Sequence, residues 1–211
     1  MDGAWVDRLE RRFGFLAAPG LPTFITGMTV LVGVLGIIKP EFADILALDP
    51  VALAHGQVWR CVSFLFVPPP ISPLWLVLWI LLFLYPVLHG LELAWSEFKF
   101  TVFLLIGILA TAAGALAVNA EFGNSFVILA AFLAFARLLP DREVLVMFVL
   151  PVKMRWLAGL AALWLALEFV TNGLATRVEL LTGLLPYFLF FGEGHRRDLA
   201  LAWRRWRQNR P

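Results

Sequence analysis

The sequence is short of charge. Only 15% of its 211 residues are Asp, Glu, Lys or Arg, whereas a soluble domain carries about 25%. Hydrophobic residues make up 61% of the chain, so it cannot supply the polar surface that a soluble fold of this size needs. The composition therefore predicts an integral membrane protein.

Cysteine and histidine are also scarce. Cys61 is the only cysteine, which excludes a disulfide within the chain and leaves no redox or metal pattern. The three histidines, His55, His89 and His195, are too scattered to form a zinc motif. We expect neither a metal ion nor any other cofactor.

Apolar runs recur along the chain at lengths that suit membrane-spanning helices. Six of them are predicted to span the bilayer: residues 21–38, 73–91, 100–119, 122–136, 156–171 and 178–192. The fourth and the sixth are short for a hydrocarbon core of about 30 Å. Residues 144–151 are apolar but too few to span, so we expect them to lie at the interface or to pack as a connector.

The distribution of basic residues supports six spans. With the N-terminus inside, every basic residue except Lys39, Arg60 and Arg177 falls on the cytoplasmic side, as the positive-inside rule predicts. We therefore expect an all-α integral membrane protein with six transmembrane helices and both termini cytoplasmic, in a plasma membrane or a bacterial inner membrane. Its parts would be an amphipathic interfacial segment at 1–20, the membrane domain at 21–192 and a basic tail at 193–211.

Both ends of the chain are amphipathic and rich in arginine. Their apolar residues recur at helical spacing, namely Trp5, Leu9, Phe13 and Leu16 in the first segment and Leu199, Trp203 and Trp206 in the second. Such segments bind the surface of anionic lipid. A solvated basic tail that only fixes topology is an equally good interpretation of the C-terminal end. Nucleic acid is not expected as a partner.

Two features concern packing within the bundle. The third run carries a stripe of small residues, Gly107, Ala110, Gly114 and Ala117, which would let neighbouring backbones approach closely. The connection at residues 39–72 is long, amphipathic and aromatic rather than polar. A connection of that length is expected to fold and to pack against the rest of the protein.

Several short motifs follow one another in order along the chain. The outer connection contains Gly56-Gln57-Val58-Trp59-Arg60, the second span ends in Leu91-Glu92 with Lys99-Phe100 after it, and the fourth opens on Gly123-Asn124-Ser125. Pro140, Pro151, Lys153 and Trp156 then form a Pro…Pro-x-Lys-x-x-Trp pattern. From about Gly56 to Gly183, the chain resembles the rhomboid superfamily. The resemblance implies a six-helix rhomboid-like bundle in which these motif residues, Glu92 included, are architectural.

Rhomboid proteases cleave peptide bonds in the membrane with a serine and a histidine, aided by oxyanion donors. Ser125 falls on the position of the serine. The other catalytic positions have changed: the glycine after the serine is Phe126, the two donors are Leu76 and Ile80, and the histidine is Thr176, with Glu179 at the glycine that follows it. Losing a base typically lowers the rate by about 10²–10⁴. Neither His89, near the cytoplasmic end of the second span, nor His55, in the outer connection, is expected to replace it.

The resemblance therefore implies a catalytically inactive pseudoprotease, related to derlins and iRhoms, that binds transmembrane segments of partner proteins without cleaving them. Ser125 would be a small residue that begins a helix. The alternative is an atypical intramembrane serine protease that uses Ser125. A small-solute transporter is a weaker interpretation, because the sequence shows no inverted repeat and no pair of broken helices.

The rhomboid substrate entrance lies between the second and fifth spans. It gives the candidate client-binding residues: Leu76, Trp79, Ile80 and Phe83 on one side, and Trp164 and Phe169 on the other. The short fourth and sixth spans would thin the bilayer around these residues. The alternative to a client-binding role is that the aromatic residues among them simply face lipid. Glu168, Arg177 and Glu179 are costly within spans, and we expect Glu168 and Arg177 to satisfy each other or to reach the interface.

Overall fold

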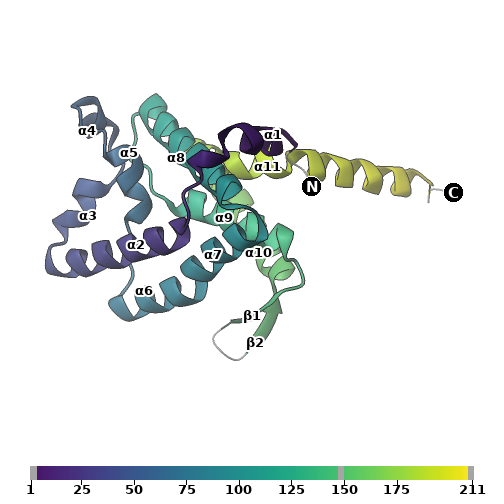
Figure 1. Ribbon diagram of the computed structural model, residues 1–211, viewed down its shortest axis with the longest axis horizontal. Helices are drawn as coiled ribbons and strands as arrows, with labels where there is room; N and C mark the ends of the chain where they lie inside the picture. Colours follow the sequence, from purple (N-terminus) through teal and green to yellow (C-terminus); the bar gives the residue numbers. More distant parts are fainter. Residues whose placement is uncertain (1–3, 147–149, 209–211) are drawn as a thin grey trace.

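The computed structural model describes residues 4–146 and 150–208, and nearly all of its elements are helices (Figure 1). Five stretches of helix are long and apolar enough to cross a membrane. They are α2 (Leu21–Ile38), the run Pro73–Ala94, α8 (Glu97–Val118), α10 (Met154–Thr171) and the part Leu174–Arg197 of α11. This is the architecture of an all-α, multi-pass membrane protein.

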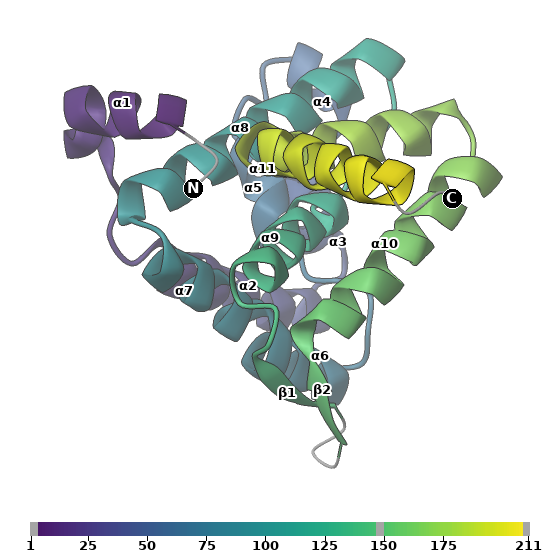
Figure 2. The same cartoon turned by 90° about the vertical axis from the view of Figure 1, so that its right-hand side faces the viewer.

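The fourth expected span is α9 (Ser125–Leu138), which is shorter than these five helices and forms the centre of the bundle. From Phe126 to Ala136 almost every residue of α9 is buried, and α7, α8, α10 and α11 all pack against it (Figure 2). At 1.5 Å per residue its 14 residues extend about 21 Å. The expectation of a short fourth helix is confirmed.

The second long run is one helix with a π-helical turn in its middle. It consists of α6 (Pro73–Trp79), the π-helical turn η3 (Ile80–Leu84) and α7 (Tyr85–Ala94). Such turns are rare and often lie at functional sites. Here the turn brings the ring of Phe83 to 5.3 Å from that of Phe132 on α9.

The expectation that residues 39–72 fold and pack is confirmed. They form α3 (Glu41–Leu46), α4 (Pro50–Ala54), α5 (Arg60–Ser63) and the 3-10 turn η2 (Phe64–Phe66). The buried guanidinium of Arg60 donates to the carbonyl oxygens of Asp44 and Ala47 and to Oε1 of Gln57, each at 2.7 Å. One charged side chain thus fastens the start of the connection to its middle, which is an architectural role.

The N-terminal segment forms the expected amphipathic helix, α1 (Ala4–Phe13), followed by the 3-10 turn η1 (Gly14–Leu16). Trp5 packs edge-on against Phe190 of α11 with 5.6 Å between ring centroids. Lys99 Nζ lies 2.6 Å from Asp7 Oδ1, and this hydrogen bond lowers the pKa of Asp7. One face of α1 is therefore docked on the bundle, while Leu9, Phe13 and Leu16 stay exposed.

The expectation of a short sixth span is wrong. α11 (Leu174–Gln208) is one helix of 35 residues with Pro186 inside it, so the expected boundary at residue 192 falls within a continuous helix (Figure 1). Arginine and glutamate are good helix formers. Charges such as Glu193 and Arg196 can thus end an apolar run without ending the helix. Trp203 is exposed on α11, and the side chains of Leu199 and Trp206 lie outside the described residues.

The connector between α9 and α10 is an antiparallel hairpin of β1 (Glu143–Val146) and β2 (Leu150–Lys153). Glu143 stands opposite Lys153, and Pro151 opposite Leu145. The sequence does not predict this hairpin. The run at 144–151 lacks the alternation of polar and apolar residues that indicates a strand, and it contains no Gly or Asn to form a turn. Residues 147–149 lie outside the described residues.

The small-residue stripe of α8 is a packing surface in part. A Cβ on Gly107 would lie 3.0 Å from Val127 of α9, and one on Gly114 would lie 2.8 Å from Thr182 of α11. Ala110 is half-buried and Ala117 is exposed. The close approach that the stripe predicts is therefore made by its two glycines.

Candidate functional site

Ser125 is the first residue of α9 and opens into a groove between the helix of residues 73–94 and α10. The groove has a volume of about 210 Å³ and is lined by Pro69, Trp79, Phe83, Asn124, Ser125, Ile128, Leu129 and Trp164. We call it the Ser125 groove. A smaller cavity of about 180 Å³, between Ser125 and the loop at residues 67–70, adjoins it. The hydroxyl of Ser125 is thus presented at an open site.

The segment before α9 is held from two sides. Nδ2 of the buried Asn124 donates to the carbonyl oxygens of Leu65 and Val67, at 2.8 and 2.9 Å, which ties it to the outer connection. The backbone N–H of Gly123 donates to Oε1 of Glu179 on α11 at 2.8 Å. These bonds fix where the helix begins and so fix the position of Ser125.

The Ser125 groove contains no general base among the described residues. His55 ends α4, His89 stacks on Tyr85 and lies 3.8 Å from Glu92, and His195 is hydrogen-bonded to Tyr187. These histidines and Thr176 line neither the groove nor the adjoining cavity. Within the part of the chain that the structure describes, Oγ of Ser125 has no hydrogen-bond partner.

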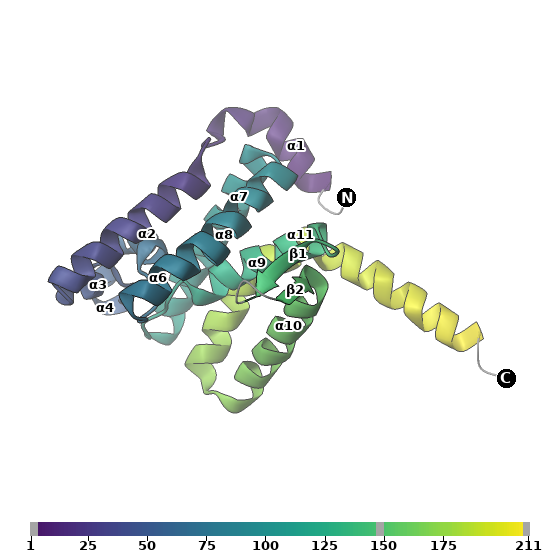
Figure 3. The ribbon, with the colours of Figure 1, turned by 90° about the horizontal axis from the view of Figure 1, so that it is seen from below.

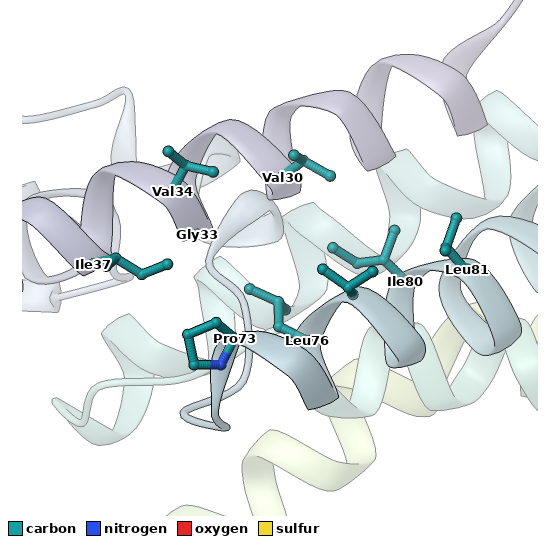
Figure 4. A pocket seen from close by; sticks show the side chains of 9 residues that line it. Val30, Gly33, Val34, Ile37, Pro73, Leu76, Ile80 and Leu81 are labelled. Atoms are coloured by element: carbon teal, nitrogen blue, oxygen red, sulfur yellow. The ribbon is translucent and has the colours of Figure 1, made fainter. Parts of the chain in front are cut away.

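The two positions expected to carry oxyanion donors lie elsewhere. Leu76 and Ile80 line a separate, apolar pocket between α2 and α6 (Figure 4). Leu76 reaches so close to Gly33 that a Cβ on this glycine would lie 2.7 Å from Cδ2 of Leu76. Neither residue could serve Ser125, because both have aliphatic side chains that pack towards α2.

The sequence does not predict the partner of Glu179, which is part of the site. Its position within a span marked it as unusual, but no pattern linked it to Gly123, 56 residues away. Its carboxylate accepts the hydrogen bond of the backbone N–H two residues before Ser125, so this donor is not free. Oxyanion stabilisation needs free donors aimed at the developing negative charge. A carboxylate in that place opposes such a charge.

Phe126 fits where the rhomboid pattern has glycine because another glycine makes room for it. Gly183 of α11 faces Phe126, and a Cβ on Gly183 would lie 2.5 Å from Cβ of Phe126. The ring of Phe126 stacks on Trp164 at 6.2 Å. The bulky residue therefore joins α9, α10 and α11 instead of leaving bare backbone beside the serine.

The expected client-binding residues separate into three places. Trp79, Phe83 and Trp164 line the Ser125 groove together, and the rings of Trp79 and Phe83 stack at 6.2 Å. Leu76 and Ile80 lie in the pocket against α2. Phe169 lines a further cavity between α10 and α11. Only three of the expected residues therefore share one site.

Glu168 and Arg177 do not pair with each other, because each has other partners; that they reach the interface stays a prediction. Arg177 donates to the carbonyl oxygens of Phe169 and Val170, and Glu168 accepts from Nδ2 of Asn172. The last turn of a helix exposes carbonyl groups that a nearby cation can satisfy. Arg177 therefore caps α10 rather than neutralising Glu168.

Among the motif residues, Pro151 and Lys153 lie on β2, and the others lie in loops or near helix ends. Gly56 has a φ of 92°, a left-handed conformation that favours glycine, while Trp59 and Trp156 are exposed. The carbonyl oxygen of Pro140 accepts from the backbone N–H of Arg155 at 3.1 Å, which brings the two ends of the hairpin together. The described residues contain no cluster of side chains that could hold a metal ion.

No family model matches the sequence, and no curated protein matches it either.

Replacing Ser125 with alanine should leave the free energy of unfolding within about 1 kcal/mol of the wild type, because the hydroxyl holds nothing in place. The wild-type protein should not react with a fluorophosphonate probe in membranes. Labelling that disappears in Ser125→Ala would show that the serine is an activated nucleophile and would overturn this interpretation.

Proposed function

We propose that the protein is a rhomboid-like pseudoprotease that binds transmembrane segments of partner proteins and does not cleave them. The observation that carries the proposal is the Ser125 groove. It has aromatic walls on two different helices, a small polar floor and no general base among the described residues. A site of this kind favours binding a helix over chemistry on it.

The groove offers two kinds of contact to a client helix. Trp79 and Phe83 form one wall and Trp164 the other, and large aromatic residues dominate the energetics of interfaces. Ser125 provides a hydroxyl at the floor, whereas Nδ2 of Asn124 already donates to the carbonyl oxygens of Leu65 and Val67. Polar groups of a client helix are expensive to leave unpaired in a membrane. The groove therefore suits clients with a polar or helix-breaking position.

The helix on one side of the groove is only lightly held. Of the residues of α10, only Met154 and Leu165 are buried, and α10 lies at the edge of the bundle (Figure 2). Shifting such a helix disturbs little of the core. Entry of a client between α6 and α10 would then be a displacement of α10, a motion of packed helices that proteins commonly use.

Thinning of the bilayer at this site has little support from helix length. α9 extends about 21 Å, well below the hydrocarbon thickness of about 30 Å, but α7, α8, α10 and α11 enclose it. Lipids adapt to the helices that they touch, and α11 is long. The proposed binding of client helices therefore does not depend on a thinned bilayer.

We also infer that α9 crosses the membrane as a sixth span, with both termini in the cytoplasm. α1 contacts the first turn of α8 through Asp7 and Lys99, and it contacts α11 through Trp5 and Phe190. The N-terminal helix and the later part of α11 therefore share one end of the bundle. Arginines are concentrated there, which favours the cytoplasmic side.

Replacing Trp164 with alanine should lower the recovery of co-purified transmembrane partners about tenfold, the loss expected for an aromatic anchor at an interface. Trp156→Ala is the matched control, since Trp156 is an exposed tryptophan of the same helix that does not line the groove. The measurement is quantitative mass spectrometry of proteins purified with each variant from native membranes. Equal recovery with both variants would contradict the proposal.

A further inference from the structure

A larger cavity lies on the other side of α10, between α9, α10 and α11. Its volume is about 810 Å³ and it opens to the surroundings. Its lining extends along α10 from Arg155 to Val170, which corresponds to about 22 Å at 1.5 Å per residue. We call it the α10–α11 cleft; Figure 3 shows the turn that joins the two helices at the edge of the bundle.

The α10–α11 cleft is apolar along most of its length and basic at one end. Arg137, Arg155, Tyr187 and His195 gather where α9 ends and α10 begins. The hydroxyl of Tyr187 and Nε2 of His195 are 2.7 Å apart. Asp141 Oδ1 lies 3.5 Å from Nη1 of Arg155, but both side chains are more than half exposed. An exposed pair of this kind is weak, so Arg155 can still bind another anion.

Small residues line the wall that α10 contributes, namely Ala158, Gly159, Ala162 and Ala166. Small residues on membrane helices normally let two backbones approach closely. Here the cleft lies between this wall and α11, and a Cβ on Gly159 would meet nothing within 4 Å. An open apolar space in a bilayer fills with hydrocarbon chains, because its walls then regain dispersion contacts.

We propose that the α10–α11 cleft binds one anionic phospholipid. Its phosphate lies against Arg155, within reach of the Tyr187–His195 pair, and an acyl chain runs past Ala162 towards Phe169. The basic end favours a lipid over a client helix, because client helices carry basic residues at their cytoplasmic ends. The binding of this lipid depends on the orientation inferred above, with the termini in the cytoplasm, and does not depend on the client-binding function. The cytoplasmic leaflet supplies anionic headgroups.

The test is native mass spectrometry of the full chain released from nanodiscs that contain phosphatidylglycerol and phosphatidylcholine. The wild type should retain one phosphatidylglycerol in preference to phosphatidylcholine. The variant Arg155→Gln should lower that preference about fivefold, the effect of one basic residue near the membrane surface. The matched variant Arg196→Gln removes an arginine that does not line the cleft, and it should keep the preference.

A second pair of variants tests the apolar part of the cleft. Ala162→Phe fills the space and should abolish lipid retention, whereas Leu163→Phe, one residue along and outside the lining, should not. Equal retention of both lipids by the wild type would overturn the proposal, as would retention by Ala162→Phe. A photo-crosslinker at Gly159 that yields protein adducts instead of phosphatidylglycerol adducts would also overturn it, and would assign the cleft to a client helix.

Discussion

Replacing Gly183 with valine should destabilise the bundle by about 3 kcal/mol, the upper part of the usual range for overpacking. A Cβ at this position would lie 2.5 Å from Cβ of Phe126, 3.1 Å from its carbonyl carbon and 3.2 Å from the backbone nitrogen of Val127. Backbone atoms cannot rotate away as the end of a flexible side chain can. The whole of α11 would have to move from α9, and the N-terminal turn that presents Ser125 would move with it.

Gly192→Val is the matched control for this experiment. Gly192 belongs to the same helix, and a Cβ there would meet nothing within 4 Å. Valine and glycine differ little in helix propensity, so the control should stay within about 0.5 kcal/mol of the wild type. Unfolding in mixed detergent, followed by circular dichroism, measures both variants. Equal stability of Gly183→Val and Gly192→Val would show that α9 and α11 do not pack as described.

Replacing Arg60 with methionine should cost about 3 kcal/mol, because buried acceptors lose a charged donor. Arg60 is 8% exposed and makes three hydrogen bonds of 2.7 Å within the outer connection. Methionine has a similar length but donates nothing. The stability of Arg60→Lys should lie between that of the wild type and that of Arg60→Met, since one ammonium group cannot reproduce the forked geometry of the guanidinium.

The loss of stability in Arg60→Met should lower the melting temperature and should also increase local opening of the connection. Limited proteolysis between residues 39 and 72 should accelerate in Arg60→Met, since local opening exposes backbone to cleavage. Lys39→Met removes an exposed basic residue from the same connection and should leave both the melting temperature and the cleavage rate unchanged. Unaltered cleavage in Arg60→Met would mean that Arg60 does not hold the connection together.

Much of the fold could be predicted from the sequence, because helix ends in a membrane are often marked by charge or proline. α2 has the bounds that its uncharged run predicts, residues 21–38. The folded outer connection was also predictable, since backbone at that depth has to be packed. α11 was not, because its later charges change the polarity of a helix that continues to Gln208.

The candidate site could be predicted only in part. The motifs single out Ser125 and predict that its usual catalytic partners are missing, since both expectations concern single positions. Sequence spacing cannot tell which neighbouring helix covers each side chain of a helix. Leu76 and Trp79 lie three residues apart on α6, before the π-helical turn, yet Leu76 packs towards α2 and Trp79 lines the Ser125 groove. The bond between Gly123 and Glu179 joins distant segments and has no local signal.

Photo-crosslinking in native membranes tests the binding of client helices most directly. A photoreactive residue is placed at Trp79 or Trp164 in the Ser125 groove, with Leu109, an exposed residue of α8 outside the groove, as the control. We predict discrete protein adducts at both groove positions, with the partner protein at its full length, and none at Leu109. Lipid adducts alone at Trp79 and Trp164 would contradict the proposed function.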